Sequence, residues 1–192
     1  MAGYGGVMRL ELVRQQLEEY AGADEREAGF VLRMLELCGA AQACERSHFR
    51  PGHFTASAFV LSPERREVVL IHHKKLGIWV QPGGHVEPSD VDLLSAARRE
   101  VLEEVGLSLL EPIRVSATTP VFDVDIHTIP ARKEDPAHEH FDVRFAFVAQ
   151  SRDIVRSDEV ADLRWVPLGE VSQMGSDESV LRAVNKLRSL LG

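Results

Sequence analysis

One acidic helix constrains the fold of this chain more than any other feature. Between about residues 91 and 105, apolar residues recur at helical spacing and form one stripe: Leu94, Ala97, Val101 and Val105. At the helical rotation of about 100° per residue, three glutamates fall within an arc of about 100° beside that stripe: Glu100, Glu103 and Glu104. We therefore expect this helix to bury its apolar side and to expose its acids.

Three carboxylates this close repel one another and weaken an isolated helix. Solvent and the neighbouring arginines, Arg98 and Arg99, are one form of compensation, and a solvated acidic face is the ordinary outcome for such a cluster. A divalent cation is the other, because Mg²⁺ takes oxygen ligands and often lies between carboxylates and substrate phosphates.

The rest of the chain alternates between strand and helix patterns. Runs of β-branched and aromatic residues predict strands over residues 54–62, 67–73, 113–129, 140–150 and 163–168. A further helix is expected over roughly 176–190, and the spacing over 7–38 predicts helices, with Asp24 and Glu27 resembling a capping box. This order predicts an α+β fold, an α/β/α sandwich with a mixed sheet. We expect an N-terminal helical extension (1–50) before the main domain (51–192).

Composition narrows the function classes. The chain has 192 residues and a net charge of −8, which argues against a stable nucleic-acid complex or membrane binding. It has no apolar run that would span a bilayer, and its start lacks the features of a signal peptide. Cys38 and Cys44 have no metal-ligand spacing around them, so we expect reduced thiols and a cytoplasmic protein.

The residues flanking the acidic helix extend the pattern. The helix follows the loop "QPGGHVEP" and ends in a glycine followed by an apolar residue. The stretch resembles the Nudix box, G-x5-E-x7-R-E-U-x-E-E-x-G-U, in which U is apolar. Gly84 is the opening glycine, and the second half matches at every fixed position: Arg99, Glu100, Val101, Glu103, Glu104, Gly106 and Leu107.

The first half of the box departs from the pattern. Asp90 stands where the first glutamate belongs, and eight residues instead of seven separate it from Arg99. The extra residue falls where the loop enters the helix: Ser89 and Asp90 are good N-cap types, and Asp92 stands three residues after Ser89. The spacing within the helix is unaffected. Asp90, Asp92 or neither takes the role of the first acid.

The resemblance implies a Mg²⁺- or Mn²⁺-dependent enzyme that hydrolyses a pyrophosphate bond in a nucleoside diphosphate linked to another moiety. An NDP-sugar, ADP-ribose, a dinucleotide polyphosphate and a noncanonical NTP all fit. By position, Glu100, Glu103, Glu104 and the Gly84 carbonyl would bind the metal, and Arg99 would orient a box glutamate. Glu100 or Glu103 would be the general base, with Glu159 as a candidate from a later loop.

Other residues are candidates for contacting the substrate: Lys74, Trp79, His85, His138, His140 and Asp142. Trp79 belongs either to the core or to a base-stacking surface. His138, His140 and Asp142 alternate, so a strand would project them from one face. His-x-His on a strand can bind a transition metal, but no third soft ligand is evident, so we favour a polar wall of the substrate cleft.

A different function also fits part of the pattern. A catalytically inactive Nudix-like module would sense a nucleotide or act as a scaffold, although such proteins commonly lose box glutamates and all three are present here. An isopentenyl diphosphate isomerase resembles the family in fold but needs a core cysteine, which this chain lacks after Cys44. The N-terminal helices would either form a homodimer or pack within the chain, and the sequence favours neither.

Overall fold

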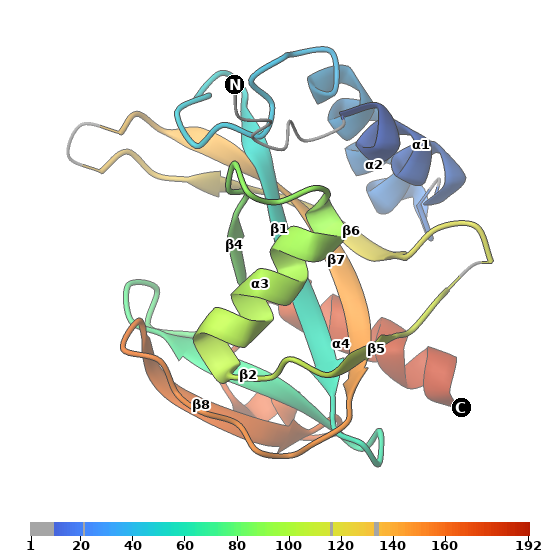
Figure 1. Cartoon of the computed structure of the whole chain (residues 1–192), viewed down its shortest axis with the longest axis vertical. Coiled ribbons are helices and arrows are strands. Elements are labelled where there is room, and N and C mark those ends of the chain that lie inside the picture. Colours follow the sequence, from blue (N-terminus) through green and yellow to red (C-terminus); the bar gives the residue numbers. More distant parts are fainter. Residues whose placement is uncertain (1–9, 21, 116, 133–134) are drawn as a thin grey trace, which may run out of the picture.

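Two long strands, β1 (Gly52–Leu61) and β7 (His138–Ala149), run parallel through the middle of a mixed sheet (Figure 1). The computed structural model describes residues 10–20, 22–115, 117–132 and 135–192. The remaining strands all pair antiparallel. Strands β2 (Glu67–His73) and β4 (Gly83–His85) pair with β1, and strands β5 (Leu110–Pro112) and β6 (Val121–Ile129) pair with β7. Strands β3 (Trp79–Val80) and β8 (Val160–Pro167) pair with β2. The expected mixed sheet is confirmed.

Helices cover both faces of this sheet. In Figure 1, α3 (Leu93–Val105) lies in front of β1 and α4 (Glu178–Leu191) lies behind it. The helices α1 (Leu10–Tyr20) and α2 (Glu25–Leu37) lie beside β6, and a short 3₁₀ turn (Val171–Gln173) precedes α4. The α+β sandwich predicted from the sequence is therefore confirmed. Among the described residues, no helix is both long and apolar enough to cross a membrane.

The alternation of side chains along β1 separates the two faces. Phe54, Ala56, Ala58 and Val60 belong to the core cluster that contains the buried side of α3. Phe59 and Leu61 belong to a second cluster, which contains the buried side of α4. Both faces are covered, so β1 is buried along its whole length, as expected for a strand in a two-sided core.

Two expectations about local structure need correction. The run 113–129 forms a strand only from Val121, and just before this strand the Thr119 hydroxyl accepts a hydrogen bond from the Val121 amide. At the start of α2, Asp24 accepts from the Glu27 amide, but the Glu27 carboxylate turns instead to the Ala23 amide, Tyr20 and Lys186. Positions 7–9 of the predicted helical pattern lie outside the described residues.

A buried guanidinium organises the α4 face. Arg144 on β7 is fully enclosed and donates to the Asp142 carboxylate (2.8 Å), to Asp123 (3.3 Å) and to the Ser179 hydroxyl (2.9 Å). Asp123 also accepts from Arg182 of α4, at 2.6 Å and 3.0 Å. Buried charges of this kind are tolerated only when they are paired and hydrogen-bonded.

We predict that Arg144→Met destabilises the protein by about 3–5 kcal/mol, because Asp142 and Asp123 lose a buried cation. Urea unfolding followed by circular dichroism measures this change. The matched control is Arg26→Met, which removes an exposed pair with Glu178 and should cost less than about 1 kcal/mol. Equal costs for the two variants would contradict the role given to Arg144.

Candidate active site

The acidic helix begins at a capping box that the sequence analysis did not place. The Asp92 carboxylate accepts from the Ser95 amide at 2.7 Å, and the Ser95 hydroxyl accepts from the Asp92 amide at 3.1 Å. Ser89 and Asp90 do not cap the helix, so our expectation for them is corrected. The helix ends as expected, at Gly106 in the left-handed conformation (φ 75°).

Asp90 has a different partner. It is buried, and its two carboxylate oxygens accept from Nε and Nη2 of Arg99, at 3.1 Å and 3.0 Å. Paired contacts of this type match the planar fork of the guanidinium. Of the two aspartates left open by the sequence, Asp90 therefore supports Arg99, and Asp92 caps the helix.

Arg99 also joins the acids to the glycine strand. Its Nη1 donates to Glu100 (3.0 Å) and to Glu103 (2.9 Å), while its Nη2 donates to the His85 carbonyl (2.8 Å). One guanidinium thus compensates three carboxylates and holds β4 beside α3.

Glu104 faces inward, contrary to the expectation that the helix exposes all its acids. Its side chain is buried, and its carboxylate accepts a hydrogen bond from the Gly83 amide of β4 at 2.9 Å. Burial raises the pKa of Glu104 to about 7, and burial likewise raises the pKa of Glu100. Glu103 is the open member, with 54% of its side chain exposed.

The absence of a side chain at Gly84 makes room for Glu100. A Cβ at this position would lie 2.7 Å from Oε1 of Glu100. Glu100 and Glu104 therefore converge on consecutive glycines, where their charges repel and Arg99 contacts only one of them. Hard oxygen donors, clustered and partly desolvated, fit a divalent cation such as Mg²⁺.

The later-loop acid lies within electrostatic reach of this cluster. Glu159 is exposed in the turn just before β8, and its charge contributes to the raised pKa of Glu104. The Lys74 ammonium donates to the carbonyl of Asp158, the residue before Glu159, so Lys74 lies beside this turn. Trp79 is 9% exposed in the second core cluster, with the Arg164 guanidinium 5.1 Å from its ring centre.

The predicted substrate histidines lie together with two that the sequence analysis did not single out for a site. The rings of His85, His138 and His140 all contact that of His53, with centres 4.9–5.2 Å apart. His127 contacts His140 at 5.4 Å. His53 was missed because it is 87 positions from His140, and only the parallel register of β1 and β7 pairs them.

Asp142 is buried on the same face of the sheet as these histidines. It accepts from the hydroxyls of Thr55 (3.2 Å) and Ser57 (2.8 Å) as well as from Arg144. These contacts occupy both of its oxygens, so the structure places Asp142 in the buried polar row of the α4 face.

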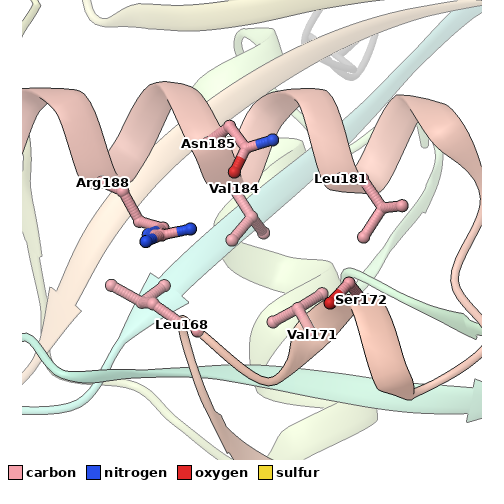
Figure 2. A pocket seen from close by; sticks show the side chains of 8 residues that line it. Leu168, Val171, Ser172, Leu181, Val184, Asn185 and Arg188 are labelled. Atoms are coloured by element: carbon pink, nitrogen blue, oxygen red, sulfur yellow. The ribbon is translucent and has the colours of Figure 1, made fainter.

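A small pocket of about 110 Å³ lies elsewhere, between α4 and the 3₁₀ turn (Figure 2). Leu168, Val171, Leu181 and Val184 supply much of its wall, and Arg188 lies at one side. None of the predicted site residues lines it.

Comparison with known proteins agrees with this geometry. A model of the NUDIX domain matches residues 51–184, and the chain therefore belongs to the NUDIX family. It is 26% identical over 120 residues to a Bacillus subtilis (strain 168) protein named "Putative 8-oxo-dGTP diphosphatase", covering 62% of this chain and 70% of that protein. These matches identify the chain as a hydrolase acting on pyrophosphate bonds.

Solved structures share the fold. A NUDIX-family hydrolase from Clostridium perfringens superposes with a TM-score of 0.52 at 26% identity, covering 72% of this chain and 97% of that one. The E. coli dihydroneopterin triphosphate pyrophosphohydrolase superposes with a TM-score of 0.57 at 18% identity, covering 72% and 94%. The second likeness shows the fold alone.

We predict that Gly84→Ala lowers activity far more than stability. The new Cβ meets the end of a flexible side chain, so Glu100 can swing away at little cost to folding while leaving its position against β4. A loss of turnover of about 100-fold is expected, the scale of a misplaced catalytic group. Steady-state kinetics and thermal unfolding measure the two effects, and wild-type turnover would contradict the assignment.

The same assays should distinguish the roles of the two loop aspartates, Asp90 and Asp92. Asp90→Asn removes the charge that fixes Arg99 and should lower turnover by at least about tenfold, one decade per roughly 1.4 kcal/mol. Asp92→Ala removes the N-cap and should cost about 1 kcal/mol of stability, with turnover nearly unchanged. The reverse pattern would show that Asp92, not Asp90, supports the site.

Proposed function

We propose that this protein hydrolyses a pyrophosphate bond in a nucleoside diphosphate linked to another moiety and depends on Mg²⁺ or Mn²⁺. The observation that carries this proposal is the convergence of Glu100 and Glu104 on the Gly83–Gly84 backbone beside Arg99. A solvated acidic face would leave both acids exposed, whereas here Glu104 is buried.

The cation would be held by Glu100, Glu103, Glu104 and the Gly84 carbonyl, all of which offer hard oxygen ligands. When bound, such a cation neutralises phosphate oxygens and lowers the pKa of a coordinated water. Arg99 orients Glu100 and Glu103 through its two Nη1 contacts.

Glu103 is our first choice for the general base. It is the most exposed of the box acids, and only its Oε2 is engaged by Arg99 in the contacts described, so the side chain can receive a proton from water at the surface of the cluster. Glu159 is the alternative because it is exposed and its charge contributes to the raised pKa of Glu104, so it lies within electrostatic reach of the cluster. Glu104 suits this role less well, since the Gly83 amide holds it in place.

The proposed substrate is a nucleotide that contains a pyrophosphate bond. The name of the Bacillus subtilis relative points to an oxidised purine triphosphate, and NDP-sugars, ADP-ribose and dinucleotide polyphosphates fit the same reaction. We propose that Lys74 attracts a substrate phosphate, because its ammonium donates to the carbonyl of Asp158, the residue before Glu159.

The decisive experiment is a panel of these nucleotides incubated with the protein and Mg²⁺, with products separated by anion-exchange chromatography. We expect a nucleoside monophosphate product from at least one member. Glu103→Gln should reduce its rate by about 10²–10⁴-fold, the usual contribution of a general base. Glu36→Gln, which alters an exposed helical glutamate on α2, is the matched control and should retain the wild-type rate.

Two results would contradict the proposal. Turnover that persists in EDTA would exclude dependence on a divalent cation. Tight binding of a nucleotide without hydrolysis across the whole panel would favour the sensing or scaffold alternative, in which the box acids serve binding alone.

A further inference from the structure

Five histidines gather at one end of the sheet: His53, His85, His127, His138 and His140, called here the histidine cluster. Each comes from a strand, so the backbone of the sheet sets their positions. In three of them, His53, His85 and His140, one ring nitrogen each lies within 4.8 Å of the other two. This grouping differs from the His138 and His140 pair considered from the sequence, because His53 and His85 take the place of His138.

His53 is prepared to coordinate a metal. The residue is 0% exposed, and its Nδ1 lies 3.2 Å from the His48 carbonyl. A carbonyl oxygen can only accept, so Nδ1 carries the proton and Nε2 presents its lone pair. That Nε2 is buried and has no hydrogen-bond partner among the described residues. Ligating histidines typically donate their second nitrogen to a backbone carbonyl in this way.

The histidine cluster and the box glutamates of α3 lie on opposite faces of the sheet. His53 pairs with His140, and Thr55 pairs with both His85 and Asp142. Directly paired residues project to the same face, and the next residues along the strands project to the opposite one. Gly84 precedes His85 and faces Glu100, so the imidazoles and the box acids form separate ligand sets.

The geometry points to a transition-metal site, with His53, His85 and His140 as three imidazole ligands of a Zn²⁺ ion. Nitrogen ligands in a tetrahedral zinc site lie about 2.0–2.1 Å from the ion, which sets them about 3.3 Å apart. In the structure these nitrogens lie within 4.8 Å of one another, so metal binding requires the three rings to move closer together.

Three protein ligands leave one coordination position open, as in zinc sites that bind water or substrate. His85 and His140 are only partly buried, so that position can open toward solvent. His138 packs against the three proposed ligands: its ring stacks on that of His53, and its Nδ1 lies 2.8 Å from the Pro136 carbonyl. Mg²⁺ does not suit these ligands, because it prefers oxygen.

Zinc binding by the whole chain, stripped of metal, tests this site. The titration is run in excess Mg²⁺, which occupies the carboxylates, against a chromophoric zinc chelator. We expect one tightly bound equivalent. Co²⁺ in its place should show the intense visible bands of tetrahedral nitrogen coordination. His140→Gln and His53→Gln should weaken binding by more than the roughly 10–100-fold that a lost supporting partner costs.

Matched controls separate this site from the proposed active centre. His72→Gln alters a strand histidine outside the cluster and should bind zinc like the wild type. Glu103→Gln should also retain zinc, even where hydrolysis is lost, so the two proposals fail independently. His140 is partly exposed, and thermal unfolding without metal verifies that its variant folds.

Two outcomes would overturn the inference. One is equal zinc affinity in the wild type, His140→Gln and His53→Gln. The other is a wild-type protein that binds no zinc in excess Mg²⁺ while the same variants raise KM for a nucleotide, which would make the cluster a polar wall of the cleft.

Discussion

The candidate site depends on one guanidinium. Arg99 contacts Asp90, Glu100, Glu103 and the His85 carbonyl, so it ties the loop, the helix and β4 together. Without this cation, the carboxylates that Arg99 contacts would repel one another. The contact also explains why the altered box remains compatible with the site. An aspartate is one methylene shorter than a glutamate, and the longer loop brings its carboxylate to Arg99 nonetheless.

A strand of three residues separates two kinds of chemistry. Gly84 and His85 are consecutive in β4, yet Gly84 gives space to an acid on the α3 face while His85 projects among imidazoles. Strand alternation produces this separation directly. The box glutamates thus lie on one side and the imidazoles on the other, although the two sets share a backbone and the Arg99 contact to the His85 carbonyl.

Much of the site was predictable because it is local in sequence. The helix and its glycine end follow from spacing within one element, and the resemblance implied that Arg99 orients a box glutamate, which Arg99 contacts at Glu100 and Glu103. The burial of Glu104 was not predictable, since it depends on an amide from β4 that helical periodicity does not place. The grouping of His53 with His140 depends on the register of two strands far apart in the chain, which pattern alone cannot give. The capping residue was missed because several suitable types stand in a row before the helix.

The N-terminal helices join the domain through charge as well as apolar contact. Glu27 of α2 accepts from Arg182 at 2.6 Å and from Lys186 at 3.0 Å, both on α4, and from the Tyr20 hydroxyl. Burial raises the pKa of Tyr20, so its hydroxyl stays a donor. Arg182 then reaches Asp123, which contacts Arg144 and, through it, Asp142 on the same face of the sheet as the histidines. The buried members of this series need their neighbours, because an unpaired buried charge is costly. They are Glu27, Asp123, Asp142 and Arg144. Removing Glu27 would therefore leave two cations of α4 sharing Asp123, and the disturbance would fall on the row of residues that supports the histidine cluster.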